Sequence, residues 1–325
     1  MGKYYNVREA LRRNGVITVV CGGRGIGKSF SAKRVIIDEW IKSGWQAMYV
    51  RRFVDDLRIF KTFFNDIAEY YTDYEFKVDG FTGYGRLRGD EPWDVIVTAT
   101  SMSTAHKLKS GSFKEVKYIL FDEFIAAPNS RYLTNEVDTL YELYSTVDRY
   151  EDRVRVIMLA NAVSIDNPYF NRWGINSGVE WQKHGGGFVV CHLPAAEEFT
   201  RAAKKTRFGS FVLNHEPSYA AYSIDNKFID NTDAFIGERP AGSEPVFAVR
   251  TPEIEVTFWK MLEPGYCVTT GIHGEKRFAI DCTPKVGEKP MPRNDEIIRI
   301  MRSKWYLGRL VFTSMAARNA FRKLL

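Results

Sequence analysis

The sequence predicts an α/β fold, in which a parallel sheet flanked by helices is built around a phosphate-binding loop and a smaller α+β domain follows. A β-branched apolar run at residues 16–21 leads into a glycine-rich loop and then into a helical pattern at 28–42. Further strand-like runs alternate with helical stretches as far as residue 193, which is typical of a parallel sheet covered on both faces. The chain then becomes charged and weakly amphipathic. We therefore expect a first domain at 1–195, a helical linker at 196–232 and a second domain at 233–325.

The other elements follow from hydrophobic periodicity and turn residues. Residues 54–71 carry apolar side chains near the helical period, with Arg58 and Lys61 on another face. Thr134 can cap a helix. That helix would bury Val137, Leu140, Tyr141, Tyr144 and Val147. In the first domain we also expect a short basic helix within 1–14, a hairpin within 75–89, a loop or short helix at 101–113, and strands at 46–51, 95–100, 116–121, 154–160 and 188–193. In the second domain we expect strands at 246–250, 256–259, 266–271 and 278–281, followed by a basic helical tail from 295.

The composition argues against several classes of protein. No apolar run in the 325 residues approaches the roughly 20 residues of a membrane span, and the N-terminus lacks the apolar core of a signal peptide. The four cysteines are scattered, which favours buried thiols in a reducing cytoplasm over disulfides. The five histidines show no metal-ligand spacing. We therefore expect no membrane partner and no zinc site.

The glycine-rich loop has the spacing of the phosphate-binding loop of nucleotide triphosphatases, G-x-x-x-x-G-K-S. Its glycines let backbone N–H groups curl around phosphate oxygens, and the following helix adds the positive end of its dipole. Lys28 can reach the β- and γ-phosphates, and the Ser29 hydroxyl can bind Mg²⁺. The alternative is a glycine-rich turn between a strand and a helix. We expect ATP to contact Gly22, Gly23, Arg24, Gly25, Ile26, Gly27, Lys28 and Ser29.

Polar residues end two of the later strands. The apolar run at 116–121 is followed by Asp122 and Glu123, the arrangement of a Walker B motif. Asp122 would hold Mg²⁺ through water, and Glu123 would polarise the attacking water as general base. Asn161 ends the strand at 154–160 and can sense the γ-phosphate or orient that water. The alternative is an asparagine in a strand-end turn.

Basic residues occur where they could assist phosphate chemistry or bind a polyanion. Arg149 and Arg153 follow the helix that Thr134 begins, and an arginine supplied to a neighbouring subunit's nucleotide can stabilise developing charge. The alternative is surface charge at a helix end. Residues 285–325 carry ten Lys and Arg against three Asp and Glu, which indicates a polyanion partner or a solvated basic face.

These stretches resemble the genome-packaging ATPases of phi29-type tailed phages. The matches run in order from the phosphate-binding loop to about residue 240, and several are longer than generic nucleotide-binding motifs. They include GGRGIGKS at 22–29, YVRR at 49–52, FDEF at 121–124, TNEV at 134–137, LANAVS at 159–164, NPYF at 167–170, KKTRFGS at 204–210 and SIDNKFI at 223–229. The resemblance implies an ASCE-class ATPase domain, a helical linker and a degenerate RNase H-like C-terminal domain. It also implies a homopentameric ring in the host cytoplasm, docked at the portal vertex of a prohead and pumping double-stranded DNA inward.

The resemblance also assigns roles to single residues. It makes Lys28 and Ser29 the Walker A residues, Asp122 and Glu123 the Walker B pair and Asn161 the sensor. It implies that Arg149 is an arginine finger acting in trans and that Lys109 acts across the same subunit interface.

Two departures from the family concern DNA. The family's DNA-gripping loop carries a lysine where this chain has Val54, so Arg58 and Lys61 are the replacement candidates. In the C-terminal domain the candidate first strand ends in Arg250, and Asp281 stands nearly alone, whereas a nuclease needs clustered carboxylates. We expect this domain to bind DNA through Arg299, Arg302 and Lys304 without cleaving it.

The sequence therefore predicts a motor ATPase that translocates double-stranded DNA into a prohead. Two other functions stay open: a terminase-like packaging nuclease, and a nucleotide-gated DNA-binding assembly protein without motor activity. Whether a packaging RNA is also a partner is left open, as is the number of subunits in the ring.

Overall fold

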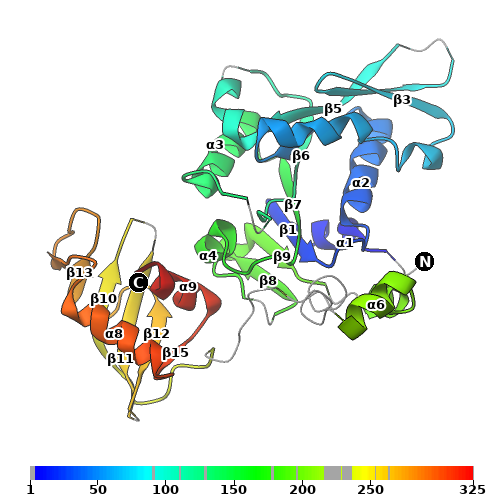
Figure 1. Ribbon diagram of the computed structural model, residues 1–325. Helices are drawn as coiled ribbons and strands as arrows, with labels where there is room; N and C mark the ends of the chain where they lie inside the picture. Colours follow the sequence, from blue (N-terminus) through cyan, green and yellow to red (C-terminus); the bar gives the residue numbers. More distant parts are fainter. Residues whose placement is uncertain are drawn as a thin grey trace. The chain divides into compact units, whose positions relative to one another are not determined.

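The computed structural model describes residues 4–89, 92–109, 111–127, 130–176, 179–194, 197–215, 228, 236–252, 254–262 and 264–324. The chain divides into two compact units (Figure 1). The first consists of Met1–Ser164 with Gly178–Ile229, and the second of Ile165–Ser177 with Asp230–Leu325. A segment in the middle of the chain thus belongs to the C-terminal unit.

The first unit is built on a nine-stranded sheet with the order β3-β4-β5-β2-β6-β7-β1-β9-β8. The six strands from β5 to β9 in this order pair in parallel, as predicted, and antiparallel strands close both edges. β8 has no counterpart in the prediction. The strands are β1 (Ile17–Gly22), β2 (Gln46–Arg51), β3 (Tyr74–Asp79), β4 (Thr82–Leu87), β5 (Asp94–Ser101), β6 (Val116–Asp122), β7 (Arg155–Asn161), β8 (Trp181–His184) and β9 (Val189–His192).

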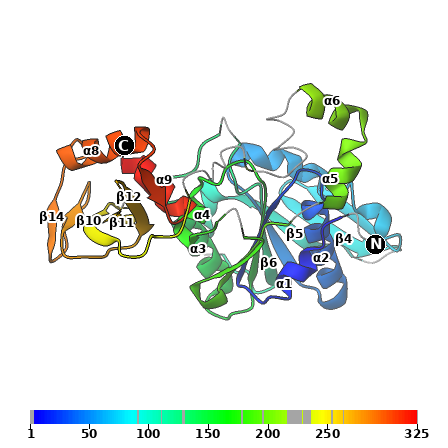
Figure 2. The same cartoon turned by 90° about the horizontal axis from the view of Figure 1, so that it is seen from below.

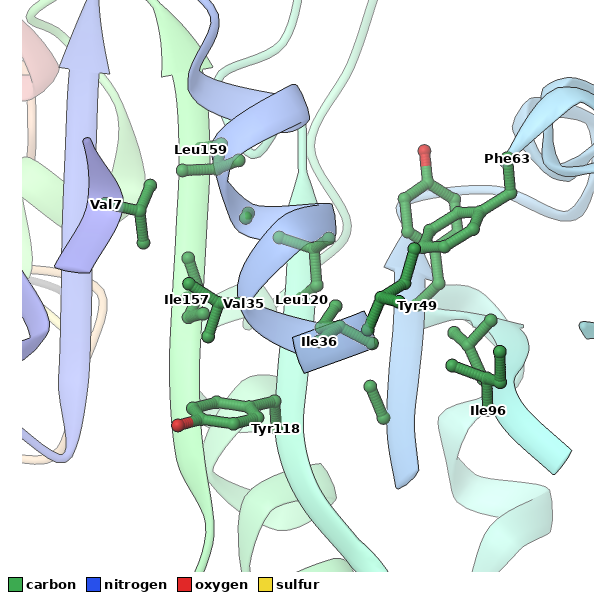
Figure 3. Packing of buried hydrophobic residues seen from close by; sticks show 14 of the residues in the cluster. Val7, Val35, Ile36, Tyr49, Phe63, Ile96, Tyr118, Leu120, Ile157 and Leu159 are labelled. Carbon is green, nitrogen blue, oxygen red and sulfur yellow. The ribbon is translucent and has the colours of Figure 1, made fainter. Parts of the chain in front are cut away.

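The parallel sheet is covered on both faces. On one face, Val35 and Ile36 of the helix after the phosphate-binding loop pack against Leu120 and Ile157 of neighbouring strands (Figure 3). The side chains that alternate with these along the strands are buried as well, for example Met158. The helices of this unit are α1 (Val7–Leu11), α2 (Lys28–Ser43), α3 (Glu136–Asp148), α5 (Glu197–Lys204) and α6 (Arg207–His215), with 3₁₀ helices η1 (Val54–Thr62), η2 (Ala68–Tyr70), η3 (Met102–Leu108) and η4 (Gly185–Gly187).

Two predicted helices differ in detail from those observed. Residues 54–71 form 3₁₀ turns, because Phe60 and Phe63 pack on Tyr49 and Phe64 packs on Phe63, at ring separations of 5.0 to 5.6 Å, and this packing holds the backbone in i→i+3 bonds. The helix expected to start at a Thr134 cap begins instead after Asn135, which has a φ of 55°.

The buried face of α3 includes the predicted residues Val137, Leu140 and Val147 but differs from the expected face at three other positions. Leu143 is buried, whereas Tyr141 and Tyr144 are half-buried. The start of the helix is set by Glu136, because its carboxylate accepts the Leu133 N–H at 2.8 Å and pairs with a buried arginine described below.

The second unit contains a six-stranded sheet with the order β14-β13-β10-β11-β12-β15. Three of the predicted strands, β10, β11 and β12, pair as an antiparallel meander, and β13 and β14 join it in parallel beside β10. Helices α8 and α9 cover one face of the sheet (Figure 2). The elements are α4 (Pro168–Trp173), β10 (Glu244–Arg250), β11 (Glu255–Lys260), β12 (Tyr266–Thr270), β13 (Arg277–Ala279), β14 (Glu288–Pro290), α8 (Glu296–Tyr306), β15 (Leu310–Phe312) and α9 (Met315–Leu324).

Within this unit α4 packs on α9, where the Asn319 amide donates to the Asn171 side chain at 3.3 Å. In the predicted linker the structure describes α5 and α6, while residues 216–227 and 229–235 lie outside the described residues. No helix in the described part of the chain has the length and apolar character needed to cross a membrane.

Candidate nucleotide site

The phosphate-binding loop connects β1 to α2 at the carboxyl edge of the parallel strands. Gly25 and Gly27 have φ values of 82° and 88°, a left-handed backbone that favours glycine. A Cβ on Gly27 would also lie 3.2 Å from the side chain of Tyr4. The neighbouring Tyr5 N–H donates to the Ile26 carbonyl at 2.7 Å, so the segment before α1 braces the loop. These contacts require glycine at position 27.

Lys28 is buried at the start of α2 with its ammonium group turned into the loop. Its Nζ donates to the carbonyls of Gly22 at 3.0 Å and Gly23 at 2.7 Å, and to Asn161 Oδ1 at 3.2 Å. Burial lowers the pKa of Lys28 to about 8, against the opposing effects of Cys21 and Asp122. Phosphate oxygens that enter the loop could replace these carbonyl oxygens as hydrogen-bond partners of the buried ammonium group.

Asn161 reaches this position because of strand order. β7 lies between β1 and β6, and Gly22 pairs in register with Asn161. The residue that ends β7 therefore stands directly beside the residue that begins the loop.

Asp122 meets the loop from the other side of Asn161. Its Oδ1 lies 3.2 Å from Ser29 Oγ, which places a carboxylate and a hydroxyl oxygen together. Oxygen donors of this kind are the ligands that Mg²⁺ prefers, so the pair fits the ion. Burial raises the pKa of Asp122, while Arg51, Ser29 and Lys28 favour its charged form.

Glu123 has a left-handed backbone, with a φ of 57°, and its N–H donates to Asp122 Oδ1 at 3.1 Å. Its Oε2 accepts a hydrogen bond from Arg51 Nη2 at 2.5 Å. Arg51 ends β2, the strand that pairs with β6, and it also donates to Tyr49. The sequence analysis included Arg51 only as part of the YVRR motif at 49–52 and assigned it no role. The sequence signal that could have predicted this contact is a cationic residue at the end of the strand that neighbours the Walker B strand.

A buried ion pair supports the segment after Glu123. Arg52 Nε lies 2.9 Å from Glu136 Oε2, with exposed fractions of 5% and 0% for the two side chains. Arg52 Nη2 also donates to the Phe124 carbonyl. Arg52 thus ties the end of β2 to the start of α3 and to the chain directly after the carboxylate pair.

Arg149 lies away from these groups. It follows the last turn of α3, and its Nη2 donates to the Gly111 carbonyl at 2.6 Å. The start of β7 is nearby in sequence, whereas the phosphate-binding loop faces the opposite, carboxyl edge of the sheet. A seven-residue strand such as β6 separates the two edges by about 20 Å. Arg149 therefore lies at the edge of the sheet opposite the phosphate-binding loop of its own chain.

Lys109 and Arg153 are held near the same helix. Lys109 pairs with Glu142 of α3 at 3.1 Å, with both side chains more than half exposed. These two residues line a hollow of about 270 Å³ between η3 and α3, separate from the phosphate-binding loop. Arg153, in contrast, donates to the carbonyls of Phe113, Val116 and Val147, which makes it a structural residue.

The candidate DNA-binding residues lie on other surfaces. Arg58 is 83% exposed on η1 and pairs with Asp55, and Lys61 and Val54 are also exposed. On α8 of the second unit, Arg299 is exposed, whereas Arg302 and Lys304 are half-buried.

In the second unit the carboxylates that could have served a nuclease are paired with cations. Arg250 binds Glu288 at 2.5 Å, and Asp281 pairs with Arg293. Among the described residues no cluster of three or more His, Cys, Asp and Glu could hold a metal ion.

Comparison with known proteins shows matches over nearly the whole chain. The profile of the podovirus DNA encapsidation protein (Gp16) family matches residues 1–323. The DNA packaging protein of Bacillus phage phi29 is 33% identical over 334 aligned positions, which cover 99% of this chain and 98% of that protein.

Solved structures agree with this result. A chain of the phi29 viral genome packaging motor assembly superposes with a TM-score of 0.75 at 30% identity, with all of both chains covered. The crystal structure of the N-terminal domain of the phi29 DNA packaging ATPase superposes with a TM-score of 0.54 at 34% identity and covers 60% of this chain and 98% of that one.

Proposed function

This chain belongs to the podovirus DNA encapsidation protein (Gp16) family, and we propose that it couples ATP hydrolysis to the translocation of double-stranded DNA into a prohead. It is a DNA-packaging ATPase of the phi29 type. One observation carries the assignment of its site. Lys28, Ser29, Asp122 and Glu123 converge at the carboxyl edge of the sheet, with Asn161 supplied by the strand between them.

In the proposed mechanism the backbone of residues 22–27 and Lys28 hold the phosphates of ATP. Lys28 exchanges its carbonyl partners for phosphate oxygens, which releases the Asn161 amide to orient the attacking water. Glu123 accepts the proton of that water. Its carboxylate first has to leave Arg51, which holds it at 2.5 Å. Ser29 and Asp122 would hold Mg²⁺, which neutralises charge on the phosphates when bound.

We propose that the active form is a homopentameric ring at the portal vertex, in the cytoplasm of the host cell. The placement of Arg149 at the amino edge of the sheet supports an action on the ATP of a neighbouring subunit, with Lys109 at the same interface. An arginine that reaches a transition state in trans is typically worth 10³–10⁵ in rate.

Double-stranded DNA would be held through its phosphates. Arg58 and Lys61 on η1 and Arg299, Arg302 and Lys304 on α8 are the contacts that we propose. Phosphate contacts position a protein without reading sequence, which suits a motor that must move along any DNA. The pairing of Glu288 and Asp281 with arginines supports binding without cleavage.

The test is the steady-state ATPase rate of the full chain with and without double-stranded DNA, together with the mass of the assembly. Stimulation by DNA in a pentameric assembly is the expected result. An ATPase rate indifferent to DNA would favour the assembly protein, and metal-dependent nicking of a plasmid would favour the nuclease.

A further inference from the structure

The four residues after α3, Arg149 to Asp152, form an exposed loop in a strained conformation. Arg149, Tyr150 and Asp152 have φ values of 51°, 62° and 53°, a left-handed backbone that residues other than glycine rarely adopt. Tyr150 as a residue is 93% exposed. Such a cluster of strained residues persists only when the surrounding structure enforces it, and it points to a function.

The enforcing group is the carboxylate of Asp148, which is only 2% exposed. Its Oδ2 accepts the Asp152 N–H at 3.0 Å, and its Oδ1 accepts those of Arg153 at 3.0 Å and Val154 at 2.8 Å. These hydrogen bonds connect the end of the loop to the last residue of α3. The guanidinium of Arg153, fixed on three carbonyls, anchors the chain where the loop ends. Contacts within a single chain therefore fix the conformation of the loop without a binding partner.

In this conformation the cation of Arg149 and the aromatic ring of Tyr150 are adjacent in sequence and lie at the protein surface. The guanidinium of Arg149 donates to the Gly111 carbonyl at the surface. The phosphate-binding loop of the same chain lies about 20 Å away at the other edge of the sheet, out of reach of the 149–152 loop. A second copy of this chain offers a complementary target, because its site would combine the carboxylates of Asp122 and Glu123 with the phosphates of bound ATP.

We propose that the loop 149–152 is a preformed docking element for a neighbouring copy of this chain, with Tyr150 as its anchor and Asp148 as its positioning residue. The inference rests on the proposed function, in which Arg149 acts in trans. It adds that Arg149 is delivered by a rigid loop and that the exposed ring of Tyr150 is covered in the assembly. An aromatic side chain supplies a large contact area with few rotatable bonds, which is why such residues dominate the affinity of many interfaces.

The test uses mixtures of full-length subunits. Lys28→Ala chains keep a sound loop but have no working site, and Arg149→Ala chains keep a sound site but donate no finger. Their mixture should recover ATPase activity per assembled subunit. Tyr150→Asp added to the Lys28→Ala chain should lower this recovery at least about tenfold, the loss expected for an anchor residue. The same change added to the Arg149→Ala chain should leave most of the recovery, because that loop faces no productive interface.

The control is Phe81→Asp on the Lys28→Ala chain, an exposed ring between β3 and β4, which should leave recovery unchanged. Equal recovery with and without Tyr150→Asp on the donating chain would overturn the docking element, as would equal losses for both placements with assembly intact. Failure of the parent mixture itself, with rings formed, would reject the trans action of Arg149 and the docking element with it.

Asp148 is tested in the same mixture. Asp148→Ala on the donating chain should lower recovery as Tyr150→Asp does. Asp148→Ala in an otherwise wild-type chain should leave the affinity of that chain for ATP unchanged. Asp148→Asn keeps an oxygen for the N–H groups of Arg153 and Val154 and should restore part of the recovery. Full recovery with Asp148→Ala would show that the loop needs no positioning residue.

Discussion

Lys28 Nζ donates to Asn161 Oδ1 at 3.2 Å, although the two residues are 133 positions apart in the sequence. The contact joins the first turn of α2 to the end of β7, the strand inserted between β1 and β6. The lysine that we propose to bind phosphate and the amide that we propose to orient water are therefore in contact in the protein without ATP. In this proposal, phosphate binding rearranges the contact and links occupancy of the loop to the position of Asn161.

The affinity for ATP should fall as pH rises above about 8. Burial lowers the pKa of Lys28 from 10.5 to about 8, so the free protein loses this proton above pH 8. Phosphate oxygens favour the charged ammonium and raise its pKa, so ATP binding must take up a proton there. The dissociation constant should rise up to about tenfold per pH unit above pH 8. Calorimetry in buffers of different ionisation enthalpy should show proton uptake at pH 9 and little at pH 6.5, and Lys28→Ala should lose the difference.

Glu123→Gln should separate binding from chemistry. The amide cannot accept the proton of water, whereas the loop, Ser29 and Asp122 stay intact. ATP should bind while turnover drops by roughly 10²-fold or more, the effect of losing a general base. Lys28→Ala is the matched comparison and should lose both affinity and turnover. Normal turnover in Glu123→Gln, measured by phosphate release, would assign the base to another residue.

Glu136→Gln should destabilise the first unit far more than loss of an exposed pair. Removing one charge of the Arg52–Glu136 pair leaves a buried guanidinium without its counter-charge, which costs about 3–5 kcal/mol. The control is Arg58→Ala, which breaks the exposed pair with Asp55 and should cost less than about 1 kcal/mol. Denaturant unfolding of both variants gives the comparison. Similar midpoints for the two would contradict the structural role given to Arg52.

Arg299→Glu with Lys304→Glu should weaken DNA binding without changing its lack of sequence preference. Each lost phosphate contact lowers the dependence of affinity on salt, with a slope of about 0.9 per contact. Titrations of the full chain at several salt concentrations should show a shallower slope for the double variant on every DNA sequence. An unchanged slope would place the DNA contacts elsewhere, and thermal unfolding of the variant controls for damage to α8.

Much of the fold could be predicted because its determinants are local. The apolar runs of β1, β2, β6 and β7, the glycine spacing before α2 and the three strands β10, β11 and β12 each depend on a few neighbouring residues, and the structure confirms them. The membership of the family was likewise predicted and is confirmed. The roles of the site residues stay predictions, although the structure brings Lys28, Ser29, Asp122, Glu123 and Asn161 together.

Where local patterns compete with distant contacts, the prediction was wrong or silent. Residues 54–71 form 3₁₀ turns in place of the predicted helix, because Phe60 and Phe63 pack against Tyr49. The start of α3 was displaced from Thr134 because Glu136 is bound by Arg52, which is 84 positions earlier.

The sequence by itself determined the spacing of the phosphate-binding-loop motif, which strands form the core and where positive charge accumulates, because glycine spacing, apolar period and composition act within a few residues. The tertiary structure decided that β7 stands between β1 and β6, that Arg51 holds Glu123, that residues 165–177 belong to the C-terminal unit, and that Asp148 locks the loop carrying Arg149. These outcomes depend on strand order and on partners distant in the chain, and the free energy of such contacts is set only when the whole domain packs.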